Sequence, residues 1–160
     1  MDDQLNAHTL DKRDTLDALD REFARLHLRA CALVENTPTG LLYRQSPSGS
    51  SASVGASVLK YAATIEQTFG GITANLWDDP FEWTLPEHLS TPAKVIEHLK
   101  EVEATRARAF SSFQDDASLL KHIAVPAGGT QPLITLIQET LARAVDYQEQ
   151  AAVRLKSLSY

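Results

Sequence analysis

The sequence has little cysteine and lacks long apolar runs. Cys31 is its one cysteine, so no disulfide can form within the chain. It lies late in an apolar helical pattern, which favours a small packing residue over a nucleophile. No stretch reaches the roughly 18 apolar residues of a membrane-spanning helix, and the polar, acidic start MDDQLNAHTLDKRD differs from a secretion signal. These absences predict a cytoplasmic protein that does not enter a membrane.

Sequence signatures of common active sites are also missing. The chain contains no HExxH, no cysteine pair, no GxSxG and no glycine-rich phosphate loop. A basic stripe for nucleic acid is missing as well, because 15 Lys and Arg are interleaved with 21 Asp and Glu, for a net charge of -6. The sequence therefore disfavours nucleic-acid binding and leaves open whether the protein is an enzyme.

Four helical patterns account for most of the chain. Apolar residues, 43% of the total, recur at the spacings of three and four that mark one helix face. No strand-like alternation of any length appears, and a short helical piece is expected within 115–123. Each apolar stripe must be buried against the others, so the sequence predicts a single all-α domain over residues 1–160. We expect a four-helix bundle with a long loop between helices 1 and 2, its helices lying near residues 11–35, 55–76, 91–113 and 130–158.

The same stripes predict the core. We expect the following side chains to be buried together: Leu19, Phe23, Leu26, Ile65, Leu99, Val102, Ile137 and Leu141. Arg106 interrupts the stripe of the third helix, where its stem can be buried while its charged head reaches solvent. Gly70 and Gly71 weaken the second helix, so a kink or an early end is expected there.

Two long connections separate these helices. Segment 43–53 is rich in serine, and its length leaves room for a crossover rather than a tight hairpin. Segment 78–89 carries Phe81 and Trp83 between two prolines. These rings could pack over the open end of the core, form the lip of a pocket or make a dimer contact.

Two helical segments carry a resemblance to a known family. SVGASVLKYAATIE contains Ser53, Val54 and Gly55 at the start of a helix and Glu66 farther along, and ARAVDYQEQAAVRL contains Gln150. In these features, and in helix order and size, the chain resembles the DinB/YfiT-like four-helix bundle family. The resemblance implies a bundle in which the second and fourth helices lie together, and it implies a homodimer.

The resemblance stops at the family's metal ligands. Members hold a divalent metal with three histidines, and here Lys60, Arg143 and Tyr147 stand at those positions; a slip of one residue would place Ala144 and Gln148 at the last two. Lysine and arginine are cations that repel a metal, and tyrosine binds one only as phenolate. We therefore expect no metal and no cofactor at this place.

The residues at the vacated positions suggest another ligand. Two cations beside a phenol, with Gln150 nearby, would suit an anionic small molecule in a pocket between the second and fourth helices. The predicted pocket residues are Lys60, Arg143, Tyr147 and Gln150. Alternatively, the cations simply pair with acids on the same helices: Glu66, Glu139 or Asp146.

Two classes of function therefore stay open. The first is a bundle without metal that binds an anionic small molecule or acts as a scaffold. The second is a metal-dependent transferase or hydrolase of the DinB/YfiT type, acting on thiol-linked small molecules through other ligands. His98 and Glu101 form the best remaining metal-like pair, although they lie off the apolar stripe, and His27 lies next to the core row of the first helix.

Overall fold

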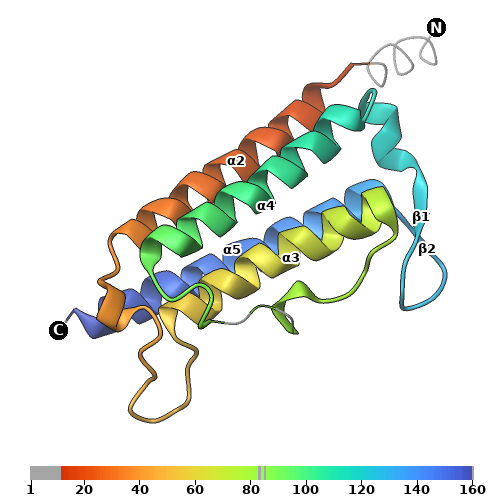
Figure 1. The fold of residues 1–160 in the computed structure, drawn as a ribbon. Helices are drawn as coiled ribbons and strands as arrows, with labels where there is room; N and C mark the ends of the chain where they lie inside the picture. The colour runs from red at the N-terminus through yellow and green to blue at the C-terminus, as the bar shows by residue number, and fades with distance from the viewer. Residues whose placement is uncertain (1–11, 83, 85, 160) are drawn as a thin grey trace, which may run out of the picture.

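The computed structural model describes residues 12–82, 84 and 86–159, and these residues form a helical bundle (Figure 1). Its long helices are α2 (Asp14–Glu35), α3 (Val54–Ala74), α4 (Pro92–Ser112) and α5 (Leu133–Leu158). Short 3-10 turns lie at η1 (Thr39–Leu41), η2 (Pro80–Glu82) and η3 (Asp116–Leu120), and a small hairpin is formed by β1 (His122–Ala124) and β2 (Thr130–Pro132). The predicted helical bundle is confirmed, as is the short helical piece within 115–123.

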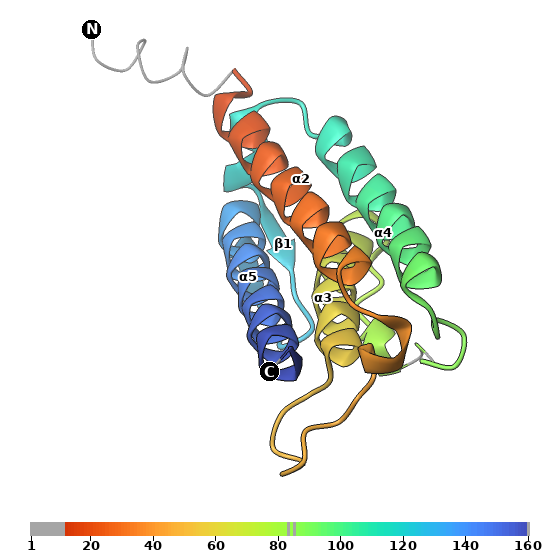
Figure 2. The ribbon, with the colours of Figure 1, turned by 90° about the vertical axis from the view of Figure 1, so that its left-hand side faces the viewer.

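The helices form two layers, with α2 beside α4 and α3 beside α5 (Figures 1 and 2). The end view in Figure 2 places α2 and α3 at opposite corners, so the predicted long connection between them, residues 36–53, crosses one end of the bundle. A second connection, residues 75–91, is here called the strap. The strap returns along α3 from one end of the bundle to the other (Figure 1).

The beginnings of two helices follow from capping residues. The Ser53 hydroxyl oxygen accepts the Ala56 N–H at 3.1 Å, and the Thr91 oxygen accepts the Lys94 N–H at 3.3 Å with Pro92 next to it. Both helices start where the sequence predicts. None of the helices in the described part of the chain is long and apolar enough to cross a membrane.

The last helix begins later than the predicted residue 130. Residues 130–132 form β2, which pairs with β1, and the Leu133 N–H donates to the Lys121 carbonyl at 2.8 Å. Strands of three residues are too short to show an alternating pattern, so this hairpin could not be predicted from periodicity. Pro132 therefore directly precedes the first residue of the helix.

The second helix passes through its glycines and ends at Ala74, two residues before the predicted end. Asn75 ends it in the left-handed conformation, with φ of 55°. Gly71 is needed for packing, because a Cβ at this position would lie 2.2 Å from the Trp77 ring of the strap. The weak helix former thus allows an aromatic ring to lie directly on α3.

The core agrees with most of the predicted side chains. Leu19 and Leu141 are only partly buried and pack against its edge, since they lie at the margin of their stripes. The rings of Phe23, Phe69 and Phe110 contact one another with centroids 5.5–5.8 Å apart. The predicted side chains that are buried are Phe23, Leu26, Ile65, Leu99, Val102 and Ile137.

Arg106 departs from the prediction that its head reaches solvent. The residue is 1% exposed, and its guanidinium contacts Asp20 of α2 and Glu103 of α4, each at 2.6 Å. It also lies over the rings of Phe23 and Phe110, 5.5 and 5.1 Å from their centroids. Burial opposes its charge, but the hydrogen bonds to Glu103 and Asp20 outweigh that cost and raise the pKa of Arg106. The carboxylate from α2 makes burial of the head possible, and this partner is distant in sequence.

Asp116 joins the start of α2 to the segment after α4. Its carboxylate accepts the N–H groups of Thr15 and Leu16, both at 2.9 Å. Burial alone would raise the pKa of Asp116, yet these backbone hydrogen bonds lower it. A residue about a hundred positions away therefore caps the first helix.

The Asp116 cap gives a pH-dependent prediction. Asp116→Asn should lower the free energy of unfolding near pH 7 by about 0.5–2 kcal/mol, because the amide accepts the helix N–H groups less strongly. Since the folded-state pKa is lowered, the carboxylate stabilises above the ordinary aspartate value of about 4, and this contribution is lost as the pH falls below it. Urea unfolding from pH 7 to pH 3 should show wild type and variant converging in acid. Asp115→Asn is the control, because Asp115 makes no side-chain capping bond.

The buried position of Leu99 gives a second prediction. Leu99 is 1% exposed within the core of α4. Leu99→Ala should therefore cost about 2–5 kcal/mol in denaturant unfolding, through lost burial and the cavity that remains. Leu28→Ala, at a side chain 68% exposed on α2, should change stability by less than about 0.5 kcal/mol. Equal losses in the two variants would contradict this packing.

Candidate anion-binding cleft

A polar cleft of about 870 Å³ lies where α3, α5 and the serine-rich connection meet. This is the end of the bundle where α5 finishes and α3 begins (Figure 1). Hydroxyl, cationic and anionic side chains line it together. The lining residues are Ser46, Ser50, Ser51, Ala52, Ser57, Lys60, Asp146, Glu149, Gln150, Val153, Arg154 and Ser157.

The structure brings together two of the four predicted pocket residues. Lys60 and Gln150 both line this cleft. Arg143 instead lines a smaller cleft of about 180 Å³, which it shares with Trp77 and Glu139 nearer the start of α5. Tyr147 is partly buried and packs against the hydrophobic core. The predicted helix pairing thus holds, but Arg143 and Lys60 face different clefts.

Arg154 is the residue that the sequence pattern did not reveal. It is 7% exposed, and its guanidinium donates to the Ser157 hydroxyl at 3.1 Å and the Arg44 carbonyl at 3.2 Å. Its Nε atom is buried without a hydrogen-bond partner, and no carboxylate among the described residues forms an ion pair with it. A buried cation normally has an anionic partner, because desolvation makes an isolated charge costly. Arg154 therefore marks a place where an anion would be stabilised.

The start of α3 adds to this positive potential. Ala52 and Ser57, on either side of the helix cap Ser53, line the same cleft as Arg154. Backbone N–H groups give a helix N-terminus a partial positive charge, and α3 has no acidic residue in its first turn to offset it. The carbonyl end of α5 offsets part of the charge of Arg154. Serine hydroxyls complete a set of donors suited to phosphate or carboxylate oxygens.

Lys60 stands between the cleft and the strap. Its ammonium lies 5.3 Å from the centroid of the Phe81 ring, an arrangement typical of a cation–π contact. Within the described residues neither Lys60 nor Arg143 forms an ion pair, so the expected pairing with Glu66, Glu139 or Asp146 is not observed. Phe81 packs under Lys60, while Trp83 lies outside the described residues.

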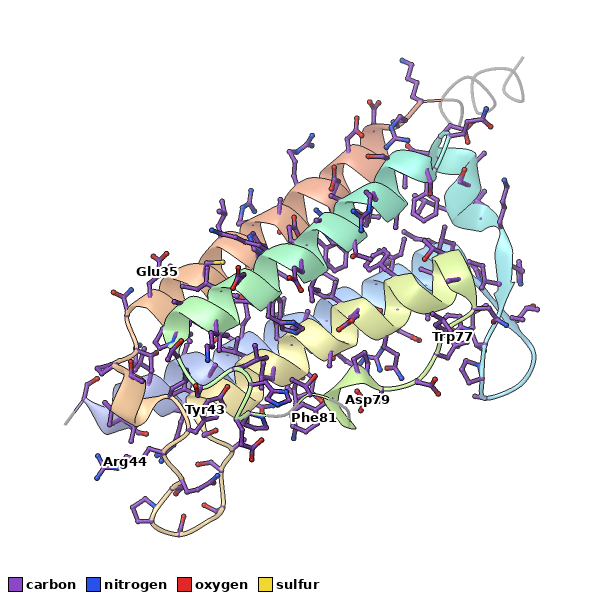
Figure 3. The ribbon with its side chains drawn as sticks, in the orientation of Figure 1. Glu35, Tyr43, Arg44, Trp77, Asp79 and Phe81 are labelled. Carbon is purple, nitrogen blue, oxygen red and sulfur yellow. The ribbon has the colours of Figure 1, made fainter. Side chains whose placement is uncertain are left out.

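The strap is held at both ends by aromatic residues (Figure 3). Trp77 packs on Gly71, and its carbonyl accepts the Gln67 side-chain amide at 2.7 Å. At the other end, the Tyr43 hydroxyl donates to the Leu89 carbonyl at 2.7 Å, and burial raises the pKa of Tyr43 to about 12. Figure 3 shows Phe81 between these two anchors. The strap therefore keeps Phe81 in place beside Lys60.

A half-buried pair of polar side chains on α2, Cys31 and His27, lacks the chemistry of a reactive centre. Cys31 Sγ lies 3.7 Å from His27 Nε2. Burial raises the pKa of the Cys31 thiol and lowers that of His27, so both are neutral at pH 7. Tyr61, near Gln148, has its pKa raised by burial and stays a phenol. The expectation that Cys31 is a packing residue fits this neutral, half-buried thiol.

The remaining metal-like residues do not gather. His98 is half-buried and Glu101 is exposed on α4. Across the described part of the chain, no group of three or more His, Cys, Asp and Glu is arranged to hold a metal ion. Gln148, one of the positions reached by the one-residue slip, is buried and donates to the Leu26 carbonyl at 2.5 Å.

Comparisons with known proteins assign no family to the chain. No family model matches the chain, and neither a curated protein nor a solved structure matches it. The function is therefore inferred from the chemistry of the cleft.

The neutral Cys31 thiol gives a prediction for chemical labelling. Iodoacetamide should modify Cys31 in the folded protein more slowly at pH 7.5 than in the urea-unfolded chain, because the folded thiol holds less thiolate. Its rate should still be rising at pH values above the ordinary thiol pKa of 9.0. Mass spectrometry of the labelled chain measures both rates. A folded-state rate that levels off below pH 7 would contradict the assignment of a neutral thiol.

Proposed function

We propose that this protein binds a small anionic molecule in the cleft between α3, α5 and the serine-rich connection. The observation that carries the proposal is Arg154, a buried guanidinium with an unpartnered Nε and no ion pair to a described carboxylate. Lys60, the start of α3 and the serine hydroxyls act in the same direction. The net charge of the chain is -6, so the attraction for an anion is a local property of this cleft.

The bound group would replace the missing counterion of Arg154. A carboxylate or phosphate in the cleft would supply the negative charge that Arg154 lacks, while the guanidinium nitrogens keep their contacts with Ser157 and Arg44. Lys60 adds a second cation if its side chain turns from Phe81 toward the ligand. Among simple anions, a group with several oxygens could then reach both cations.

The proposal extends to the type of bundle. A DinB/YfiT-like fold is supported by the order of the helices and by α3 lying beside α5. It is also supported by the Ser53-Val54-Gly55 start of α3, where Ser53 caps the helix. In this interpretation Lys60 stands where such bundles carry a metal-binding histidine. A residue that attracts anions has then replaced one that binds a metal.

Isothermal titration with inorganic phosphate, sulfate and N-acetylglycine tests the proposal. Wild type should bind at least one of these anions, more weakly as NaCl increases. Arg154→Gln should weaken binding by about tenfold or more, and Lys60→Gln by a smaller factor. Arg143→Gln is the matched control, because this exposed arginine lies in the other cleft and its loss should leave the affinity unchanged.

The structural role of Arg154 needs its own check. Its contact with the Arg44 carbonyl ties the serine-rich connection to α5, so Arg154→Gln could also lower stability. Thermal unfolding of each variant, and the effect of Lys60→Gln on binding, separate this role from anion binding. No binding by wild type at about 10 mM of any of the three anions would refute the proposed function.

A further inference from the structure

The side chains of α5 that line the cleft change from negative to positive charge along the helix. Arg154 lines one part of it, and two acids, Asp146 and Glu149, line another. Asp146 forms no ion pair with a described residue. Glu149 has a partner in Arg29 at 3.5 Å, but these side chains are 60% and 57% exposed, so the pair is weak. The acids, both exposed, therefore remain available to a cation in the cleft.

The spacing of these charges follows from the helix. Glu149 and Asp146 precede Arg154 by five and eight residues, which corresponds to about 8–12 Å along the axis at about 1.5 Å per residue. Gln150 lies between them and lines the same cleft. Its amide can both donate to and accept from the polar middle of a ligand. Along α5 the cleft thus offers the two acids, then the Gln150 amide, then the Arg154 cation.

Lys60 lines the same cleft as these acids, but its ammonium lies against the strap. Its ammonium lies over the Phe81 ring of the strap, and it forms no ion pair with Asp146 or Glu149. A ligand with negative charge at both ends would place one end against the acids, which repels it. A single small anion would leave most of the cleft of about 870 Å³ empty. Charge and size together favour a longer molecule with unlike ends.

We propose that the ligand is a zwitterionic chain whose carboxylate meets Arg154 and whose ammonium meets Asp146 and Glu149. This inference rests on the proposed function for its anionic end and adds the cationic end, the length and the polar middle. An extended peptide advances about 3.3–3.6 Å per residue, so the two charged ends of a three-residue peptide stand at about the required separation. A short peptide, or a molecule of the same charge and length, is the class of ligand that fits.

Titration calorimetry with triglycine, N-acetyl-triglycine and triglycine amide tests each end separately. Wild type should bind triglycine more tightly than either blocked peptide, by about tenfold in each case. In Asp146→Asn/Glu149→Gln, acetylation should cease to matter, because its acidic partners are gone. In Arg154→Gln, amidation should cease to matter for the corresponding reason. Glycine and pentaglycine, too short and too long to place both charges, should bind wild type more weakly than triglycine.

Glu139→Gln is the matched control for the acids. Glu139 is an exposed acid of the same helix that lines the other cleft, so the effect of acetylation should persist in this variant. The exposed positions of Asp146 and Glu149 also make a folding defect in their variant easy to exclude by thermal unfolding.

The outcomes separate this inference from the proposed function. If phosphate binds through Arg154 but wild type binds N-acetyl-triglycine as well as triglycine, the zwitterion proposal is wrong and anion binding stands. An effect of acetylation that survives in Asp146→Asn/Glu149→Gln would place the ammonium elsewhere and would also overturn it. If wild type binds neither phosphate nor any of the peptides, both proposals fail.

Discussion

The architecture depends on the burial of α3. Its sequence is apolar or small on nearly every side, from Val54 to Gly71, so one neighbouring helix cannot cover it. α5 covers one side and α4 another, and the strap runs along the remainder (Figure 1). Two glycines of α3 receive aromatic rings, because a Cβ at Gly55 would lie 2.3 Å from the Tyr43 ring and one at Gly71 would meet Trp77. The two connections therefore complete the core as well as joining helices.

The need to cover α3 also creates the cleft. The connection that brings Tyr43 onto Gly55 must pass the end of α5, where Arg154 donates to the Arg44 carbonyl. The serines that follow are too small and polar to fill the space beside Lys60. A polar hollow remains between a well-packed helix start and a buried guanidinium. The same connection, residues 36–53, therefore packs tightly at Gly55 and loosely at its serines.

The two buried arginines show how charge is treated in different parts of the bundle. Arg106 lies between α2 and α4 with carboxylates from both helices and two aromatic rings around it. Arg154 is almost as deeply buried, yet its described partners are a hydroxyl and a carbonyl. The first arrangement satisfies the cation within the protein and holds two helices together. The second leaves a capacity for an anion, which is why the cleft and not the Arg106 cluster is the candidate site.

The sequence alone determined the presence of four long helices, the places where α3 and α4 begin, and most of the core, because capping and apolar periodicity are local properties of the chain. It also pointed to Lys60 and Gln150, through the resemblance of α3 and α5 to parts of a known bundle. The tertiary structure alone decided the burial of the Arg106 head, the capping of α2 by Asp116 and the separation of Arg143 from Lys60. It also decided the role of Arg154, because a periodic pattern shows which face of α5 a residue occupies but not whether the chain brings a carboxylate to it. That partner, or its absence, depends on residues far away in the sequence.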